Sequence, residues 1–177
     1  IFAKNGIECI TVQVGQQAIR GCMACGGCAK TGKCVIDDVV NEVAAKFEAC
    51  DGLVAASPVY YASANATLVA FLQRLFYSTP FDKTMKVGAS VVVARRGGCT
   101  ASMDVLNKYF TISNMPVVAS QYWNSVHGNT PEEVKQDLEG LQTMRTLATN
   151  MAWILKSIEN NGLPKHEAEK QRTNFIR

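Results

Sequence analysis

Apolar and polar residues follow two patterns along the chain. Residues 7–14, IECITVQV, alternate between apolar and polar positions and are rich in β-branched types, which predicts a strand. Three further stretches are mainly apolar, as is typical of strands buried on both faces of a parallel sheet: 52–57, 86–94 and 115–120. Between them apolar residues recur at helical spacing, which predicts helices within 37–50, 65–76, 99–112 and from 130 to about 162.

Local signals predict where three of these helices begin and where the last one ends. Asp37 or Asp38 can cap the first helix by accepting a backbone hydrogen bond, and Asn65 can cap the second. In the last helix Thr130 is the predicted N-cap, and Glu133 completes a capping box. Gly162 is then expected to end that helix.

The alternation of Val-rich strands with helices predicts a parallel sheet covered by helices on both faces. We therefore predict an open, doubly wound α/β fold with three layers. A chain of 177 residues is long enough for one domain with a substantial core and short for two. We expect one domain over residues 1–162, with 163–177 as a C-terminal tail or oligomerisation arm.

Composition narrows the class of protein only a little. Hydrophobic residues make up 47% of the chain and charged residues 19%, which is a globular balance. The net charge of +3 is spread along the chain and predicts no nucleic-acid partner. No apolar run reaches the roughly 18 residues of a membrane span, so we expect no membrane partner and a cytoplasmic location.

Four of the seven cysteines fall within residues 21–34, GCMACGGCAKTGKC, with gaps of two, two and five residues. The two-residue gaps let Cys22, Cys25 and Cys28 approach one compact object from a single turn of chain. The gap of five residues then allows the chain to bring Cys34 back as a fourth ligand of the same object. This spacing suits a 4Fe–4S cluster held by four thiolates.

Three alternatives remain open for the four cysteines. A structural zinc site usually separates two CxxC pairs by about a dozen residues or more, so the compact spacing argues against zinc. Cys22 and Cys25 form a CxxC pair that can act as a redox-active dithiol. The third alternative is a loop that keeps this spacing and carries no cluster.

Three segments together resemble the flavodoxin-like NADPH-dependent FMN reductase family: SPVYYASANATL, ARRGG and NKYFTISNMPVVASQYWNSVHG. With the cysteine loop, the resemblance extends to the iron–sulfur flavoproteins of that group. It implies a flavodoxin-like sheet with strand order 2-1-3-4-5. In that family a central first strand and a phosphate-binding loop precede the segment that corresponds to residues 7–14. We therefore expect upstream residues that hold this strand and the phosphate site.

The resemblance also implies where FMN binds, because ligands of open α/β sheets lie beyond the carboxyl ends of the strands. The loop after 52–57 is expected to embrace the ribityl chain and the isoalloxazine. Its expected cofactor-binding residues are Ser57, Pro58, Val59, Tyr60, Tyr61 and Asn65. Without the resemblance, this loop is a plain turn between a strand and a helix.

The loop after 86–94 is the second expected part of the flavin site. Arg95 or Arg96, together with the amides of Gly97 and Gly98, is expected to donate hydrogen bonds to the pyrimidine edge of the flavin. The alternative is a solvated arginine pair beside a glycine turn. Hydride transfer needs stacking geometry rather than a protein acid or base, so the sequence assigns no catalytic residue.

Tyr122, Trp123 and His127 follow the last predicted strand. An aromatic ring there can cover the flavin or face a neighbouring subunit, although Trp and Tyr more often serve core or interface packing. His127 is expected to be a hydrogen-bonded structural histidine.

The resemblance implies an FMN-dependent oxidoreductase that accepts a hydride from NADPH or NADH and reduces a flavin, a quinone or another small acceptor. One alternative is an iron–sulfur flavoprotein that passes single electrons between FMN, a 4Fe–4S cluster and a ferredoxin-like partner. Another is a non-enzymatic flavodoxin-like electron carrier. The resemblance further implies a homodimer or a tetramer.

Overall fold

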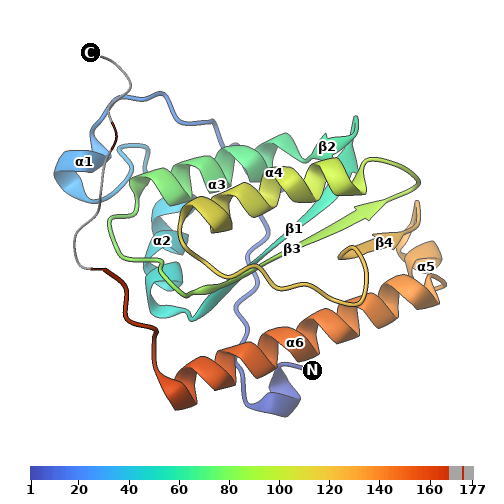
Figure 1. Cartoon of the computed structure of the whole chain (residues 1–177). Helices are drawn as coiled ribbons and strands as arrows, with labels where there is room; N and C mark the ends of the chain where they lie inside the picture. The colour runs from blue at the N-terminus through green and yellow to red at the C-terminus, as the bar shows by residue number, and fades with distance from the viewer. Residues whose placement is uncertain (168–172, 174–177) are drawn as a thin grey trace.

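The structure, a computed structural model, describes residues 1–167 and Thr173. Its sheet has the order β2-β1-β3-β4 (Figure 1). The strands are β1 (Gly52–Tyr60), β2 (Ser63–Ala64), β3 (Val87–Ala94) and β4 (Ser125–His127). β1 pairs in parallel with β3, and β3 with β4, whereas β2 runs antiparallel to β1. The predicted parallel α/β sheet is confirmed.

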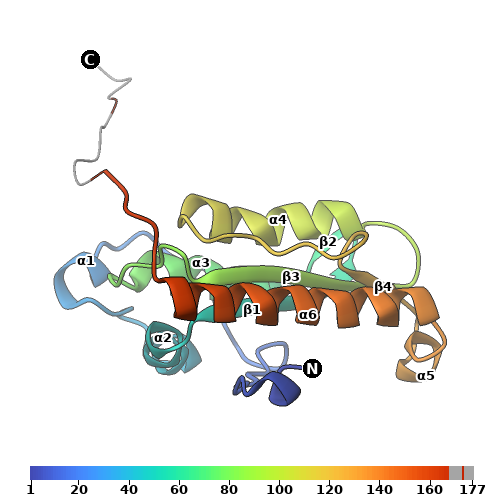
Figure 2. The same cartoon turned by 60° about the horizontal axis from the view of Figure 1, so that its bottom comes forward.

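Helices cover both faces of this sheet and make three layers (Figure 2). α3 (Ala66–Ser78) and α4 (Cys99–Ile112) pack on one face, where α2 (Val39–Ala49) joins them. The long helix α6 (Leu138–Asn161) packs on the other face. The chain also forms two short turns of helix, η1 (Ala3–Asn5) and α1 (Cys28–Thr31).

β3 lies at the centre of the core because its side chains alternate between the two layers. Val87 and Ala89 pack against Met151 of α6. Val92 and Ala94 belong to the larger cluster on the opposite face. The near-continuous apolar run of this strand, buried on both faces, is therefore the pattern that the sequence predicts.

β1 is a strand as predicted, but only one of its faces is buried. Ala55 and Ser57 are buried, whereas Val54 and Ala56 on the other face are exposed. The prediction of burial on both faces is wrong for this strand because α6 packs mainly on β3 and β4 and meets β1 at its first residue, Gly52, through Met151.

The predicted caps of two helices are confirmed. Asp38 caps α2 by accepting a hydrogen bond from the Val40 N–H at 3.0 Å. Asn65 caps α3 in the same way, with the Leu68 N–H at 3.1 Å. Each cap satisfies a backbone donor that the first turn of a helix leaves without a partner.

The prediction of a strand over residues 7–14 is wrong. The segment forms no ladder with any part of the chain that the structure describes. Its alternation is used for packing, since Val14 is buried and Val12 half-buried against the core that contains α2 and α3. A strand is defined by a neighbour that exchanges backbone hydrogen bonds with it, and alternation does not supply the neighbour.

The predicted strand 115–120 is also corrected. There the chain makes a single parallel bridge between Val117 and Gly88, leaves the sheet, and returns as β4. Asn124 closes the excursion, because its side chain donates to the Val118 carbonyl at 3.2 Å and accepts from Ser120 Oγ at 2.7 Å. This side-chain bonding replaces a stretch of ladder that an apolar run alone would predict.

The last predicted helix is split into α5 (Pro131–Val134) and α6. Thr130 caps α5, with its hydroxyl accepting from the Glu133 N–H at 3.3 Å. The Glu133 carboxylate closes the turn on the N–H of Asn129, one residue before the N-cap. α6 ends before Gly162, as predicted.

Asp137 explains the split, because it caps α6 at a second helix start. Its carboxylate accepts from the Gly140 N–H at 2.9 Å and from the His127 N–H at 2.7 Å. The second of these bonds ties the start of α6 to the end of β4.

In the predicted tail 163–177, residues 163–167 are exposed and irregular, and 168–172 and 174–177 lie outside the described residues. Among the described helices, none has the length and apolarity to cross a membrane.

Candidate functional site

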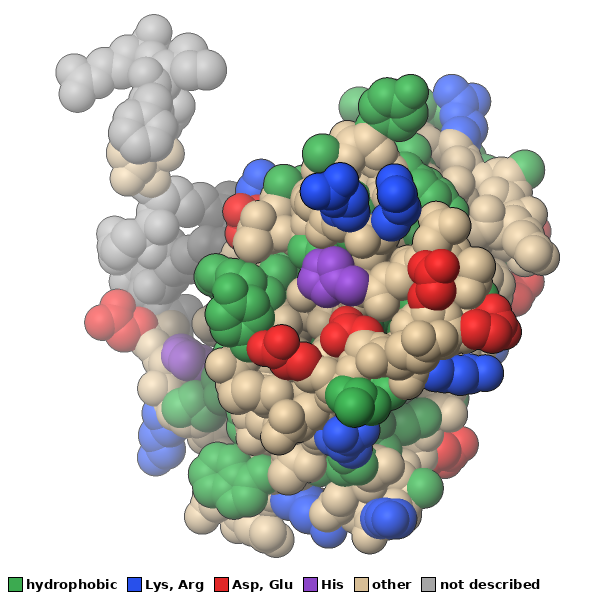
Figure 3. Space-filling model, turned by 90° about the vertical axis from the view of Figure 1, so that its right-hand side faces the viewer, with side chains coloured by type: hydrophobic (Ala, Val, Ile, Leu, Met, Phe, Trp, Pro, Cys, Tyr) green, Lys and Arg blue, Asp and Glu red, His purple; other side chains and the backbone are tan. Residues whose placement is uncertain are grey.

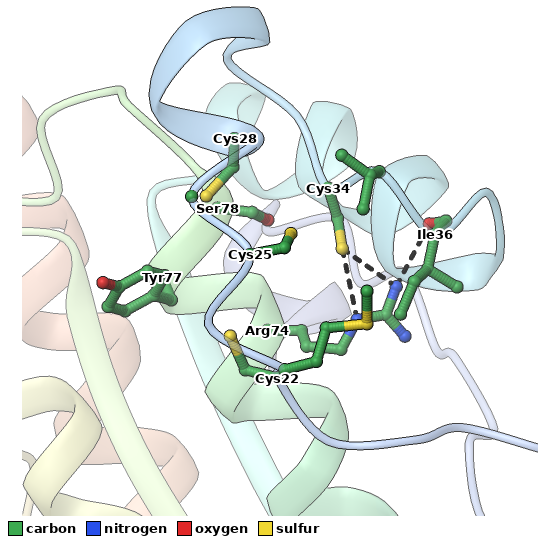
Figure 4. Close-up of a pocket in the computed structure, with 11 residues that line it drawn as sticks. Cys22, Cys25, Cys28, Cys34, Ile36, Arg74, Tyr77 and Ser78 are labelled. Atoms are coloured by element: carbon green, nitrogen blue, oxygen red, sulfur yellow. Dashed lines mark hydrogen bonds between the residues drawn. The ribbon is translucent and has the colours of Figure 1, made fainter.

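The four clustered cysteines line one pocket, as their spacing predicts (Figure 4). The loop that carries them lies against the C-terminal half of α3, which contributes Arg74, Tyr77 and Ser78 to the pocket wall. Cys22 and Cys25 are exposed, and Cys28 and Cys34 are half-buried.

Polar side chains of α2 and α3 hold the two ends of the cysteine loop. Gln73 accepts a hydrogen bond from the Cys22 N–H at 3.0 Å. Asn41 accepts from the Cys34 N–H and donates to the Cys34 carbonyl, both at 3.0 Å. Within the loop, Gly26 and Gly32 have φ values of 69° and 70°, which glycine adopts at little cost. Both anchors thus come from helices whose core faces position them.

Arg74 lines the pocket beside the cysteines, and the sequence did not single it out. Its side chain is 1% exposed and forms a bidentate pair with the Asp38 carboxylate, at 2.6 and 3.0 Å. The adjacent edge of the guanidinium, which shares Nη2 with the first, donates from Nε and Nη2 to the Cys34 sulfur, at 3.3 and 3.2 Å. The signal was present in the sequence, since Arg74 follows Phe71 by three residues and so lies on the apolar face of α3.

Hydrogen bonds lower the pKa values of the two aspartates that cap helices, Asp38 and Asp137. Burial alone would raise the pKa of Asp38, but its bonds from Arg74 and the Val40 N–H outweigh burial and lower it. The bond from the Gly140 N–H lowers the pKa of Asp137, burial opposes it, and the His127 N–H adds to the lowering.

These shifts predict a loss of stability in acid. A carboxylate with a lowered pKa in the fold stabilises the fold at pH values above its ordinary pKa of about 3.9, and that contribution is lost as the pH falls through its lower folded value. We expect the free energy of unfolding to fall below about pH 4. Urea unfolding at a series of pH values measures this, and Asp137→Asn, which keeps a capping oxygen, should flatten the profile. An unchanged profile in that variant would contradict the assignment.

The donor set of the pocket fits an iron–sulfur cluster. Four thiols that line one pocket are the ligands such a cluster takes. In the part of the chain that the structure describes, no three or more His, Cys, Asp or Glu side chains are arranged to hold a single metal ion. A four-iron cluster binds each thiolate through a different iron, so its ligands do not need to converge on one ion.

The predicted loop after β1 is rigid at its base and strained at its tip. Ser57 Oγ is buried, accepts from the Asn65 N–H and donates to the Pro58 carbonyl, both at 2.8 Å. Beyond it β1 and β2 form a hairpin whose two central residues, Tyr61 and Ala62, have φ values of 48° and 59°. Asn and Gly are the usual residues of such a turn. Non-glycine residues held there mark a place where the surrounding structure imposes the conformation.

The loop after β3 lies against this hairpin. Gly98, with φ of 98°, is the N-cap of α4. A Cβ at this glycine would lie 2.8 Å from both Ala62 Cα and Val59 Cγ1, so the two predicted flavin loops touch here. Arg95 and Arg96 are exposed beside the contact. Figure 3 shows this end of the molecule, with basic side chains above a histidine and acidic side chains below it.

His127 stands at the end of β4, where it pairs in register with Ala94 of β3. Its ring lies between two partners, with Nδ1 3.7 Å from the Asp137 carboxylate and Nε2 3.9 Å from the Cys99 sulfur. The His127 side chain is 50% exposed and both distances are long, so a structural role for this histidine stays a prediction. Tyr122 and Trp123 are exposed and in contact, with ring centroids 6.1 Å apart, so neither is a core residue.

Comparison with known proteins identifies the class. Residues 1–130 match the family model for NADPH-dependent FMN reductase, and the chain belongs to this family. An iron–sulfur flavoprotein of Methanocaldococcus jannaschii is 32% identical over 169 residues, which cover 89% of this chain and 86% of that protein. An iron–sulfur flavoprotein of Methanosarcina thermophila is 32% identical over 166 residues, 91% of this chain and 85% of that protein.

A solved structure confirms the fold. RosB, crystallised with the bound intermediate 8-demethyl-8-formylriboflavin-5'-phosphate, superposes with a TM-score of 0.65 over 99% of this chain and 81% of its own. Its sequence is 15% identical, so this likeness shows the flavodoxin-like fold alone.

Proposed function

We propose that the chain is an FMN-dependent oxidoreductase that takes a hydride from NADPH or NADH and reduces a flavin, a quinone or another small acceptor. The observation that carries the proposal is the contact at Gly98, where two loops at the carboxyl ends of β1 and β3 meet without room for a side chain. Membership of the FMN reductase family supports it. Such an edge is where open α/β sheets bind their ligands.

The residues of these loops fit an FMN site by their chemistry. Arg95 or Arg96 and the Gly97 amide would bind the pyrimidine edge, where a reduced flavin carries negative charge. The bonds of Ser57 and Asn65 keep the first loop in place, so that little ordering would be needed when the flavin binds. FMN, when bound, supplies the hydride acceptor. The protein's part is to orient the ring and expose one face to the nicotinamide.

A second function is favoured by the pocket of four cysteines, and we propose it as an extension of the first. Cys22, Cys25, Cys28 and Cys34 would hold a 4Fe–4S cluster, which accepts and releases single electrons. The pocket and the names of the two iron–sulfur flavoproteins support this proposal. With such a cluster the protein would divide the electron pair of a hydride and pass single electrons to a ferredoxin-like partner.

The test is anaerobic purification followed by absorption spectroscopy, iron and acid-labile sulfide analysis, and addition of NADPH or NADH. We expect a flavin spectrum that bleaches with at least one nicotinamide. A flavoprotein that bleaches with neither would contradict the reductase and favour an electron carrier. Iron and sulfide should be lost in Cys28→Ser and retained in Cys50→Ser, because Cys50 lies outside the pocket. Equal iron in both variants would contradict the cluster.

A further inference from the structure

The four cysteines are held very unequally, and the difference lies in what their sulfurs face. Cys22 Sγ accepts one long hydrogen bond from the Ala24 N–H at 3.4 Å. Cys34 Sγ faces the edge of a buried guanidinium and accepts from two of its nitrogens. Among the hydrogen bonds of the described residues, Cys34 is the one clustered cysteine whose sulfur contacts a cation (Figure 4).

Arg74 is itself held so that it cannot turn away from this sulfur. One side of the guanidinium is fixed by Asp38, and Nη2 also donates to the Ile36 carbonyl at 3.1 Å. Nη1 reaches the Arg20 carbonyl at 3.5 Å. Each nitrogen of the buried guanidinium donates a hydrogen bond, so its positive charge and its N–H groups keep a fixed position relative to the sulfur.

We propose that Arg74 is a positioning residue for the cluster site, which orients the Cys34 sulfur and makes a cluster bound there easier to reduce. The inference rests on the proposed cluster. Hydrogen bonds to the sulfurs and the charge around them are among the factors that set the potential of an iron–sulfur cluster. Because reduction adds negative charge, a nearby donor with a positive charge favours the reduced form.

Asp38 partly cancels the positive charge of Arg74, so the hydrogen bonds from Arg74 to the Cys34 sulfur are expected to carry most of the effect on the cluster potential. The ion pair as a whole is neutral, so at a distance its two charges largely cancel. At the sulfur the guanidinium acts directly, because Nε and Nη2 donate to it at 3.3 and 3.2 Å, whereas Asp38 bonds to Nη1 and Nη2 of the arginine. Arg74→Lys keeps the charge and loses the two-pronged geometry, so it is the informative variant.

The test is a redox titration of the reconstituted holoprotein, followed by absorbance and electron paramagnetic resonance. In Arg74→Lys and Arg74→Gln we expect the reduced cluster to be disfavoured about tenfold, which is a potential about 59 mV lower. Lys30→Gln is the matched control, since it removes a cation of the same loop that is exposed. Its potential should stay close to that of the wild type because solvent screens exposed charges.

Protein folding has to be separated from the redox effect. If the single variants fail to fold, Arg74→Met combined with Asp38→Asn removes both charges, leaves a capping side chain, and should show the same lower potential. A wild-type potential in Arg74→Lys or in the double variant would overturn the inference. A wild type that takes up no iron and sulfide would overturn the cluster and the inference together, whereas flavin bleaching by NADPH would still test the reductase separately.

Discussion

Replacing Arg74 by alanine should lower the free energy of unfolding by about 3–5 kcal/mol. The substitution leaves the Asp38 carboxylate, the Ile36 carbonyl and the Cys34 sulfur without the donors that they now have. It also empties space in a core where the arginine is 1% exposed. Chemical unfolding of the apoprotein, followed by circular dichroism, measures the effect without any cofactor.

A double-mutant cycle separates the ion pair from the packing. The Asp38→Asn variant keeps an oxygen to cap α2, so its cost should come chiefly from the lone guanidinium. Arg74→Met with Asp38→Asn leaves no unpaired buried charge, and we expect it to be more stable than Arg74→Ala. A loss below about 1 kcal/mol in Arg74→Ala, the usual value for a surface pair, would show that solvent reaches the pair.

The Gly98→Ala variant should bind FMN at least about tenfold more weakly than the wild type, if the proposed flavin site is correct. A side chain at φ of 98° costs about 1–2 kcal/mol in backbone strain. Its Cβ would also lie 2.8 Å from Ala62 Cα, which is backbone and cannot turn aside. The hairpin and the start of α4 must therefore separate, and the two predicted flavin loops with them.

A glycine outside the flavin loops is the control for this prediction. Gly162 lies outside the flavin loops and has φ of 74°, and a Cβ there meets no atom within 4 Å. Gly162→Ala therefore carries a similar backbone strain and should leave both the loop contact and FMN affinity close to those of the wild type. FMN titration monitored by flavin fluorescence compares the two variants. Equal affinity in both would contradict a flavin site at this contact, and unfolding measurements would show whether Gly98→Ala destabilises the fold as a whole.

The elements that sequence patterns predict well are those with local causes. The cap of α2 at Asp38 and of α3 at Asn65 depends on a side chain and a backbone amide two or three residues away. β3 combines an apolar run with burial on both faces, so its pattern and its place agree. The interaction that forms each helix cap lies within its own segment. Burial on both faces is common to the central strands of parallel sheets, so the apolar run of β3 predicts its place.

The predictions of strands and helices are wrong where a contact with a residue outside the segment determines the structure. Residues 7–14 alternate like a strand, but the described chain provides no strand beside them. The run 115–120 is apolar, but Asn124 turns the chain out of the sheet by bonding to Val118 across six residues. Asp137 breaks a long amphipathic stretch because it bonds to His127 of β4. Periodicity reports which face of a segment is apolar and does not report which neighbour it meets.

By itself the sequence determined the alternation of strands and helices, the grouping of Cys22, Cys25, Cys28 and Cys34, and the family resemblance that the comparisons confirm. These properties follow from spacing and periodicity, which are local. Only the tertiary structure decided that Arg74 faces the Cys34 sulfur and that Gly98 lies against Ala62. Both contacts join segments that are 40 and 36 residues apart, and such contacts are made by the packing of helices on the sheet, which no local pattern encodes.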